Sequence, residues 1–342
     1  MTPSSPPDWL NDPQARLARK NAFDAALAMG TAQFNQETGR VSSNDRPFLW
    51  ALDQSTGLLR AELAQARRCP ICQAYPGRGL FIKDGFRHVK CLECGLIYVS
   101  LVLREDILDQ YWRNEKAWSA VLNSQPQIEM DRLKFQYGLD LVSWRVPGRR
   151  LLEIGGGTGC FSRLANEAGW QVTTLELNQE NSKRLAAQGI RVIVKHLETA
   201  DLASGSFDLI SLWDVLEHVV DPGLILMEAR RLLAPGGFLL ILSPNVESLV
   251  TRLLHEKSNT FGGHSHLNHF SPLTLEGLLK KTGLDGLEME TVITELGTIN
   301  NHLAFEDAYT GSAEPLHPGL TPALIHEKLW GSRLLAVAWA KT

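Results

Sequence analysis

The chain has 342 residues, a length that suits one main domain with an accessory segment. Hydrophobic residues make up 44% of it and charged residues 21%, which is enough apolar material for a sizeable core under a charged surface. The formal net charge is −4, and Lys and Arg are scattered, which disfavours a strongly basic nucleic-acid-binding protein. Its 5 cysteines are too few for a disulfide-stabilised secreted scaffold of this length.

The start of the chain carries no targeting signal that we can identify. Residues 1–10 are rich in Pro and Ser, lack the basic and apolar regions of a signal peptide, and are predicted to be disordered. The longest apolar runs, such as Phe238–Leu242, are strand-sized and too short to span a bilayer. We therefore expect a cytoplasmic protein without a membrane partner. Nothing in the sequence indicates its oligomeric state.

Changes in composition divide the chain into four regions. Residues 13–68 are rich in Ala, Leu and Gln and are predicted to be mostly helical. The predicted regions are a mostly helical N-terminal region with a disordered start (1–66), a zinc ribbon (67–103), a helical linker or lid (104–148) and a sheet domain (149–342).

Two Cys-x-x-Cys pairs define the ribbon, and residues 73–90 separate them. This spacing is typical of zinc knuckles, in which each pair supplies one edge of a tetrahedron of thiolates. Four sulfur ligands leave no open position, so the sequence predicts a structural zinc, with a redox dithiol as the alternative. We expect the ribbon and the sheet domain to have separate cores. The predicted ligands are Cys69, Cys72, Cys91 and Cys94.

From Arg149 onward, short apolar runs alternate with amphipathic stretches. This alternation predicts βαβ units and an open, doubly wound α/β sheet of seven strands. The expected strands are Arg150–Ile154, Gln171–Glu176, Arg191–Lys195, Phe207–Leu212, Phe238–Leu242, Leu287–Thr294 and Arg333–Ala340.

A glycine turn follows the first of these strands, in the run Glu153-Ile-Gly-Gly-Gly-Thr-Gly159. Glycine lets the backbone turn sharply and approach a ligand where a Cβ would collide. Such a turn alone could also serve a dinucleotide. Glu176 ends the second strand, where a carboxylate can accept hydrogen bonds from both ribose hydroxyls. The two elements together predict a nucleoside-binding site.

Three further motifs follow in order: Phe207-Asp208, Trp213-Asp-Val-Leu-Glu-His218 and Leu233-Ala-Pro-Gly-Gly-Phe238. The series resembles the class I S-adenosylmethionine-dependent methyltransferases over roughly residues 130–300, and most of all small-molecule enzymes of the ubiquinone-pathway O-methyltransferase type. The Cys pairs with Tyr111-Trp112 also resemble the zinc-binding lead segment of some sugar C-methyltransferases. The resemblance implies a Rossmann-like methyltransferase sheet, S-adenosylmethionine as cofactor and a small-molecule acceptor, with O-, N- or C-directed transfer.

The resemblance also implies where the cofactor binds. The glycine turn would surround the methionine and ribose, Glu176 would bind the ribose hydroxyls, and residues 196–198 would lie against the adenine. Trp213 and Asp214 would face the methyl-donor end. The expected cofactor-binding residues are Glu153, Gly155, Gly156, Gly157, Gly159, Glu176, Leu177, His196, Leu197, Glu198, Trp213 and Asp214.

Methyl transfer from a sulfonium releases a neutral thioether, so the enzyme mainly aligns the acceptor and, where needed, removes its proton. Asp214, Glu217 and His218 lie at the carboxyl end of the fourth strand, where such sheets keep their sites. The resemblance implies either that His218 is the base or that the three residues hold a divalent cation such as Mg²⁺. Packing of the following helix is the structural alternative.

The segment Gly262–Pro272 holds three of the 10 histidines, at positions 264, 266 and 269. It follows the fifth strand and a helical insertion at Glu247–Lys257, the usual place of a lid over the acceptor. We expect His266 or His269 to contact the acceptor or a metal, or else to cap and orient the following helix.

Two alternatives to a small-molecule methyltransferase stay open. A methyltransferase acting on RNA could use a basic ribbon surface, for which six cationic residues are available. A catalytically silent binding module could keep the fold as a scaffold, although the glycine turn and Glu176 argue against it. The cationic residues are Arg67, Arg68, Arg78, Lys83, Arg87 and Lys90.

Overall fold

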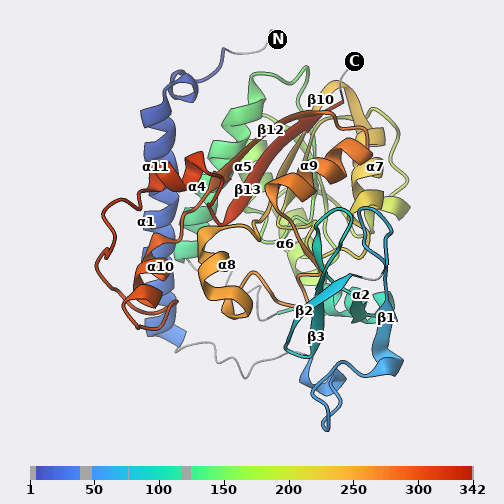
Figure 1. Ribbon diagram of the computed structural model, residues 1–342. Helices are drawn as coiled ribbons and strands as arrows, with labels where there is room; N and C mark the ends of the chain where they lie inside the picture. Colours follow the sequence, from blue (N-terminus) through green and yellow to red (C-terminus); the bar gives the residue numbers. More distant parts are fainter. Residues whose placement is uncertain (1–4, 39–47, 76, 117–124, 341–342) are drawn as a thin grey trace.

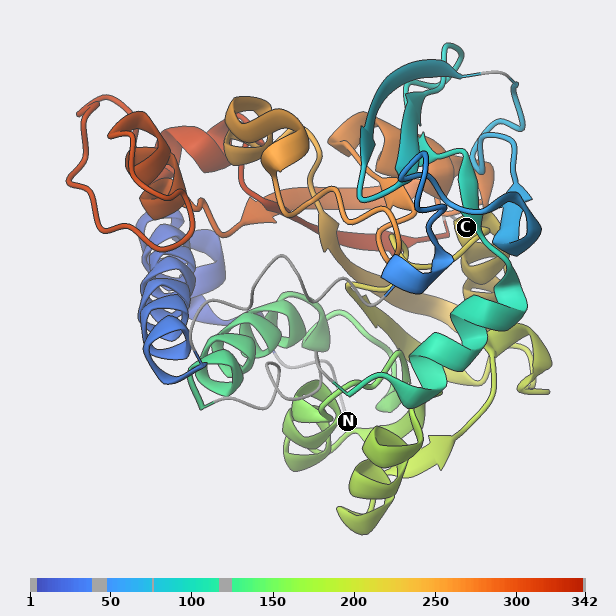
Figure 2. The ribbon, with the colours of Figure 1, turned by 90° about the horizontal axis from the view of Figure 1, so that it is seen from below.

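The computed structural model describes residues 5–38, 48–75, 77–116 and 125–340 (Figure 1). A twisted sheet forms the centre of the molecule. Figures 1 and 2 show the long helix α1 (Pro13–Thr38) on one side of this sheet and the ribbon strands on the other. Among the helices of the described residues, none combines the length and the apolar character needed to cross a membrane.

The central sheet has seven strands in the order β12-β13-β10-β9-β6-β7-β8. All neighbours pair in parallel except β13, which runs antiparallel to both β10 and β12. The order of the strands reverses between β6 and β9, which opens a crevice at their carboxyl ends. The predicted fold class is confirmed. The strands are β6 (Arg150–Ile154), β7 (Gln171–Leu175), β8 (Arg191–Ile193), β9 (Phe207–Trp213), β10 (Leu233–Pro244), β12 (Gly286–Val292) and β13 (Arg333–Trp339).

Both faces of the sheet are covered, because successive side chains of a strand point to opposite sides. In β9, Leu209 belongs to a hydrophobic cluster with residues of α1, α4 and α5, whereas Ile210 belongs to a second cluster with residues of α7, α9 and the ribbon. Every residue of β9 is buried, as expected for a central parallel strand. The covering helices are α4 (Gln125–Ser143), α5 (Cys160–Glu167), α6 (Gln179–Ala187), α7 (Pro222–Leu232) and α9 (Pro272–Lys281).

The N-terminal region is only partly the helix that its composition predicts. The segment Asp8–Asn11, expected to be disordered, forms the 3₁₀ turn η1, in which Leu10 is buried. Residues 39–47 lie outside the described residues. Beyond them the chain forms short turns and a strand instead of a second helix, because Ala64–Ala66 (β1) pairs with Leu101–Leu103 (β5).

The linker region is helical where it is described, at α2 (Glu105–Asn114) and α4, and residues 117–124 lie outside the description. The insertion after β10 is helical as expected. The remaining helical elements are η2 (Leu49–Ala51), η3 (Ala61–Leu63), η4 (Leu197–Thr199), α8 (Leu249–Leu254), η5 (His255–Lys257), α10 (Leu296–Leu303) and α11 (Pro322–Glu327).

The ribbon is built into the sheet domain. Its strands β2 (Arg78–Lys83), β3 (Phe86–Lys90) and β4 (Ile97–Val99) form a sheet with β11 (Asn268–His269), which comes from the sheet domain itself.

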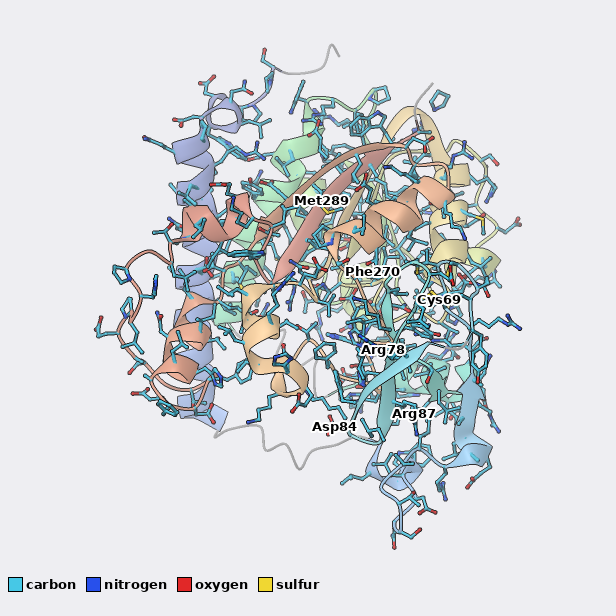
Figure 3. All side chains as sticks on the ribbon, viewed as in Figure 1. Cys69, Arg78, Asp84, Arg87, Phe270 and Met289 are labelled. Atoms are coloured by element: carbon cyan, nitrogen blue, oxygen red, sulfur yellow. The ribbon has the colours of Figure 1, made fainter. Side chains whose placement is uncertain are left out.

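Apolar side chains of the ribbon also enter one cluster with those of the central sheet and of α9, and Figure 3 shows Phe270 between Cys69 of the ribbon and Met289 of β12. The expectation of separate cores is therefore wrong. The ribbon members of that cluster are Cys69, Ile71, Val89, Cys91, Leu96 and Tyr98.

Helix α1 is held on the edge strand β12 by a partly buried ionic cluster. Glu290 of β12 accepts from Lys20 at 2.5 Å, from Arg16 at 3.0 Å and from the Tyr137 hydroxyl at 2.9 Å. Lys20 is only 6% exposed, so its ammonium depends on this carboxylate for compensation. The cluster fixes α1 against α4 and thereby closes one face of the sheet.

We expect Glu290→Ala to lower the free energy of unfolding by about 3 kcal/mol, because it leaves the buried Lys20 without an anion. Glu288→Ala is the matched control on the same strand, since the Glu288 side chain is 55% exposed and forms a surface ion pair with Arg145. Urea titration measures both variants. Equal effects from the two substitutions would contradict this account of the cluster.

Candidate active site

The glycine turn after β6 has the shape that a close-lying ligand requires. Gly155 and Gly157 have positive φ angles of 79° and 51°. A Cβ at Gly156 would come within 2.2 Å of Thr174, so the turn lies directly on β7. A Cβ on Gly157 would meet nothing within 4 Å, which leaves its outer side open for a ligand. Gly159, with φ of 80°, ends the turn at the start of α5.

Glu176 stands beside the turn, at the end of β7. Its Oε2 accepts from the Gly157 N–H at 2.6 Å and its Oε1 from the Asn178 N–H at 2.7 Å. The carboxylate is thus fixed by two backbone donors, and burial raises its pKa. A carboxylate with fixed orientation and remaining lone pairs is suited to accept the two hydroxyls of a ribose.

Glu153 lies beneath the turn rather than on its open side. It is 2% exposed, and its carboxylate accepts a hydrogen bond from the hydroxyl of Ser162 on α5. Burial raises the pKa of Glu153 to about 8. This geometry gives Glu153 a role in holding the turn against α5, and its direct contact with the cofactor stays a prediction.

The expected adenine side of the site is formed by η4. Leu197 is buried, and Glu198 is exposed. His196 bonds Asp109 of α2 through its Nε2 at 2.7 Å. Leu177, directly after Glu176, is partly buried. Helix α2 therefore reaches this side of the site, a contact between segments far apart in the chain that sequence motifs do not reveal.

The end of β9 brings Trp213 and Asp214 to the carboxyl edge of the sheet. Trp213 is 7% exposed and packs on Phe135 and Phe161, with ring centroids 4.7 and 5.1 Å away. Asp214 has a positive φ of 51°, and its Oδ1 lies 3.4 Å from Nε of Arg333. Trp213 thus serves the core at the base of the crevice.

Glu217, His218 and His266 form a compact cluster at this edge. One ligand atom from each lies within 4.8 Å of the others, and Glu217 Oε1 is 3.9 Å from His218 Nε2. His218 donates from Nδ1 to the Ser265 carbonyl at 2.9 Å, which leaves a lone pair on its Nε2. His266 bonds the Thr260 carbonyl in the same way at 2.9 Å. The structure therefore joins His266 to Glu217 and His218.

Burial sets the protonation of this cluster. It lowers the pKa of His218 and, more strongly, that of His266, so both rings are neutral at neutral pH. Burial, together with the charge of Asp214, raises the pKa of Glu217 well above its ordinary value. Ser243 donates to Glu217 Oε2 at 3.2 Å. Two neutral imidazoles with free Nε2 atoms can accept a proton or bind a cation.

Neighbouring aromatic rings enclose the cluster on one side. Trp112 of α2 packs edge-on to His218, with ring centroids 4.9 Å apart. His269, on β11, is 2% exposed. Its ring centroid lies 5.0 Å from that of His88 and 4.9 Å from that of Phe261. His269 is thus a member of an aromatic cluster that the ribbon shares, and its contact with an acceptor stays a prediction.

The sequence alone did not identify Arg333 or Ser243 as members of this site. Both reach it through the pairing of β10 with β13, in which Ser243 lies opposite Leu334. Strand pairing across a long sequence interval has no local motif, although the position of Ser243 at the end of a parallel strand is a usable signal.

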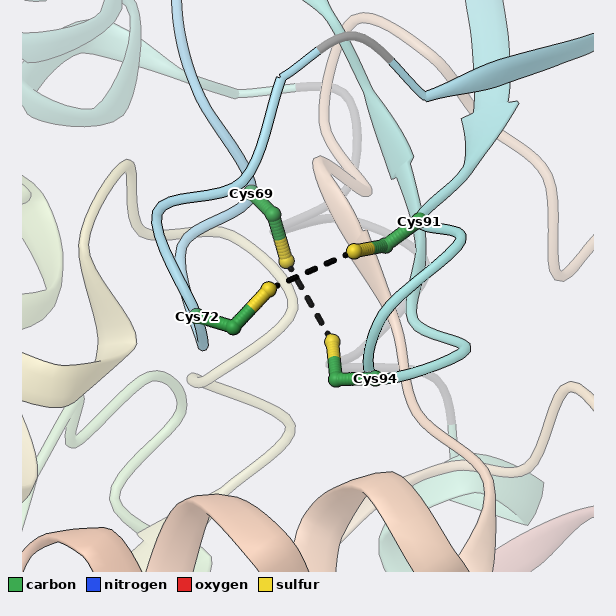
Figure 4. A group of neighbouring side chains, drawn as sticks. All are labelled: Cys69, Cys72, Cys91 and Cys94. Carbon is green, nitrogen blue, oxygen red and sulfur yellow. Dashed lines mark hydrogen bonds between the residues drawn. The ribbon is translucent and has the colours of Figure 1, made fainter.

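The four ribbon cysteines converge as predicted, from two loops that face each other (Figure 4). Their sulfurs lie within 4.8 Å of one another, and the Cys69–Cys94 and Cys72–Cys91 pairs are 3.4 and 3.3 Å apart. Sulfurs on a zinc tetrahedron would be about 3.8 Å apart, given Zn–S bonds of about 2.3 Å. The cysteine geometry therefore fits a tetrahedral zinc.

The basic residues of the ribbon do not all face outward. Arg67 and Lys83 bond backbone carbonyls of the sheet domain, Lys83 reaching the Ser258 carbonyl at 2.7 Å. Arg78 and Arg87 are exposed, and Figure 3 shows Asp84 in the same part of the ribbon. The exposed basic surface is thus smaller than the sequence count of cationic residues suggests.

Comparisons with known proteins agree with this geometry. A family described as a methyltransferase domain matches residues 127–289. A ubiquinone biosynthesis O-methyltransferase of Xanthomonas euvesicatoria is 30% identical over 187 residues, covering 49% of this chain and 74% of that protein. The corresponding protein of Bordetella avium is 27% identical over 186 residues, covering 49% of this chain and 75% of that protein.

Solved structures are similar at lower identity. A methyltransferase of Thermotoga maritima, described as a possible histamine N-methyltransferase, has 23% identity and a TM-score of 0.43, covering 60% of this chain and 89% of that one. The strand order, the glycine turn and the relatives lead to one conclusion. The chain belongs to the class I S-adenosylmethionine-dependent methyltransferases.

Proposed function

We propose that the chain transfers a methyl group from S-adenosylmethionine to a hydroxyl group of a small molecule. The observation that carries this proposal is the cluster of Glu217, His218 and His266 at the carboxyl edge of the sheet, the edge that also carries the glycine turn. The names of the relatives in Xanthomonas and Bordetella, which specify O-methyltransferases, favour oxygen over nitrogen or carbon.

The glycine turn and Glu176 would hold the cofactor. The glycine N–H groups of the turn are bonded within the protein, so the turn would offer the methionine and ribose the open space at Gly157. Glu176 would accept the ribose hydroxyls. Leu197 would pack on the adenine, with His196, Glu198 and Leu177 at its rim. When bound, S-adenosylmethionine supplies the methyl group.

His218 would remove the acceptor proton. Its Nδ1–H is committed to Ser265, so Nε2 is the basic atom, and burial keeps the ring neutral at the start of the reaction. Glu217 lies 3.9 Å from that nitrogen, and because burial favours its neutral form, it would line the site beside His218 as an uncharged polar group. His266 would complete the wall around the acceptor hydroxyl.

The expectation of Mg²⁺ does not fit the residues present. Asp214, the third predicted ligand, lies against Arg333 rather than in the cluster, and two of the three cluster members are imidazoles. Mg²⁺ prefers oxygen ligands, whereas two imidazoles and one carboxylate suit a transition metal. We therefore assign the cluster to proton removal.

The cysteine cluster would hold one structural zinc. Four thiolates fill a tetrahedral shell and leave no position for substrate, so this metal would stabilise the ribbon without taking part in methyl transfer. Transfer to RNA has less support, because Arg67 and Lys83 are committed to internal carbonyls. The cytoplasmic location stays a prediction.

We expect Glu176→Gln to weaken binding of S-adenosylhomocysteine about 10²-fold, because two charge-assisted hydrogen bonds to the ribose lose about 1.5 kcal/mol each. Since burial raises the pKa of Glu176, affinity should also fall on acidification at a higher pH than for an exposed Glu. Calorimetry measures both, with the exposed Glu180→Gln on α6 as control. Unchanged affinity in Glu176→Gln would remove the assignment.

The proposed reaction is tested with labelled S-adenosylmethionine against a panel of phenols and aliphatic alcohols, with amines and total RNA as competing acceptors. On the best acceptor, His218→Ala should lower kcat about 10²-fold, whereas the exposed His317→Ala should not.

For the wild-type chain, kcat should fall with acid only below pH 6.5, since burial lowers the pKa of His218 from its ordinary value of 6.5 and the base must be neutral. Turnover lost to chelator and restored by Mn²⁺ while the ribbon keeps its zinc would assign the cluster to a cation instead. Labelling of RNA alone would refute the small-molecule acceptor.

Elemental analysis should find one zinc per chain, lost in Cys91→Ser plus Cys94→Ser and kept in Cys160→Ser. Because the ribbon shares its core with the sheet, removal of zinc should lower the melting temperature of the whole chain in a single calorimetric transition. Two separate transitions, with that of the sheet unmoved, would show that the two cores are independent.

A further inference from the structure

Arg67, at the start of the ribbon, joins three separate segments of the chain. Its Nε donates to the Val99 carbonyl of β4 at 2.8 Å and its Nη1 to the Val220 carbonyl at 2.7 Å. Its Nη2 donates to the Leu267 carbonyl. The first acceptor belongs to the ribbon, and the other two belong to the segments that carry His218 and His266.

Those two segments are also bonded to each other. The Glu217 carbonyl accepts from the N–H groups of Leu267 at 2.6 Å and Asn268 at 3.1 Å. The Asn268 side chain donates to the carbonyls of Leu216 and Val219 at 2.9 and 2.8 Å. The backbone around His218 is therefore held by the strand that follows His266.

The ribbon holds that strand in turn. β11 pairs antiparallel with β4, placing Asn268 opposite Tyr98 and His269 opposite Ile97. The Leu267 carbonyl accepts from the Val99 N–H at 2.9 Å as well as from Arg67. The segment that carries His266 is thus the fourth strand of the ribbon sheet and a wall of the acceptor site at once.

The chemistry of arginine suits this junction. A planar guanidinium presents its donors in a rigid fork, so carbonyls bound to different nitrogens are fixed in distance and direction. A lysine ammonium is a point charge on a flexible stem and could not fix three carbonyls in distance and direction. The Arg67 guanidinium also lies over the Tyr98 ring, 5.5 Å from its centroid.

We propose that Arg67 is a positioning residue for methyl transfer, through which the cysteine ribbon sets the placement of His218 and His266. The guanidinium holds the backbone two residues after His218 and one residue after His266, and so fixes the two imidazoles relative to each other. Their ring centroids are 4.9 Å apart. This inference rests on the proposed function, in which that pair faces the acceptor.

The test needs no acceptor. The side-chain ¹⁵N signals of histidine are recorded by NMR on the full-length chain bound to S-adenosylhomocysteine, and His218 and His266 are assigned with single His→Gln variants. Arg67→Met keeps the length of the side chain and removes its donors. Arg68→Met is the matched control, because the neighbouring Arg68 is exposed and donates only weakly, to the Gln73 carbonyl at 3.3 Å.

We expect Arg67→Met to move the signals of His218 and His266, to leave that of the exposed His317 in place, and to change the Kd for S-adenosylhomocysteine less than twofold. Arg68→Met should leave all three signals unmoved. Signals of Arg67→Met that coincide with the wild type, or equal movements in Arg68→Met, would overturn the proposal.

A loss of cofactor binding would mean that Arg67→Met has not folded, and Arg67→Lys then decides. In folded Arg67→Lys, the single ammonium cannot replace the three bonds of the guanidinium, so the signals of His218 and His266 should shift. Signals of Arg67→Lys that coincide with those of the wild type would overturn the proposal. The outcome is independent of the proposed function, because signals can move even if His218→Ala retains full turnover. In that case Arg67 would position a pair that does not act on the acceptor.

Discussion

The carbonyl oxygen of Glu217 is the point on which the proposed acceptor side of this enzyme depends. It accepts the N–H groups of both Leu267 and Asn268, and these two bonds hold the turn after β9 against the segment that follows the insertion at α8. The Asn268 side chain and the bond from His218 to the Ser265 carbonyl add to this connection between the two segments. The ribbon contributes to the same junction through β4 and Arg67.

The proposed cofactor side depends on a different hydrogen bond, which joins residues that are close in the sequence. Glu176 accepts the Gly157 N–H, so the glycine turn and the carboxylate proposed to bind the ribose orient each other before any ligand arrives. The proposed site therefore has two parts at one edge of the sheet. The cofactor part is formed by adjacent βα units, and the acceptor part is assembled from segments that are distant in the sequence. Alignment of cofactor and acceptor, which is the main demand of methyl transfer, follows from the rigidity of both.

This difference explains what the sequence could predict. The seven strands, the glycine turn and the convergence of the four cysteines follow from local patterns, and the structure agrees with each. The grouping of His266 with His218, the pairing of Asp214 with Arg333 and the shared core of ribbon and sheet depend on β11 and β13 pairing across long intervals. No short motif encodes such pairings, and for that reason the sequence did not join His266 to His218 and the expectation of separate cores was wrong.

The central claim is that one edge of the sheet aligns the methyl group of the cofactor with the His218 cluster. A crystal structure of the chain with S-adenosylhomocysteine tests it most directly. The account predicts ribose hydroxyls on Glu176 and a sulfur atom facing the open space bounded by Glu217, His218 and His266. A sulfur atom that faces away from these residues, with other polar groups around it, would contradict the account.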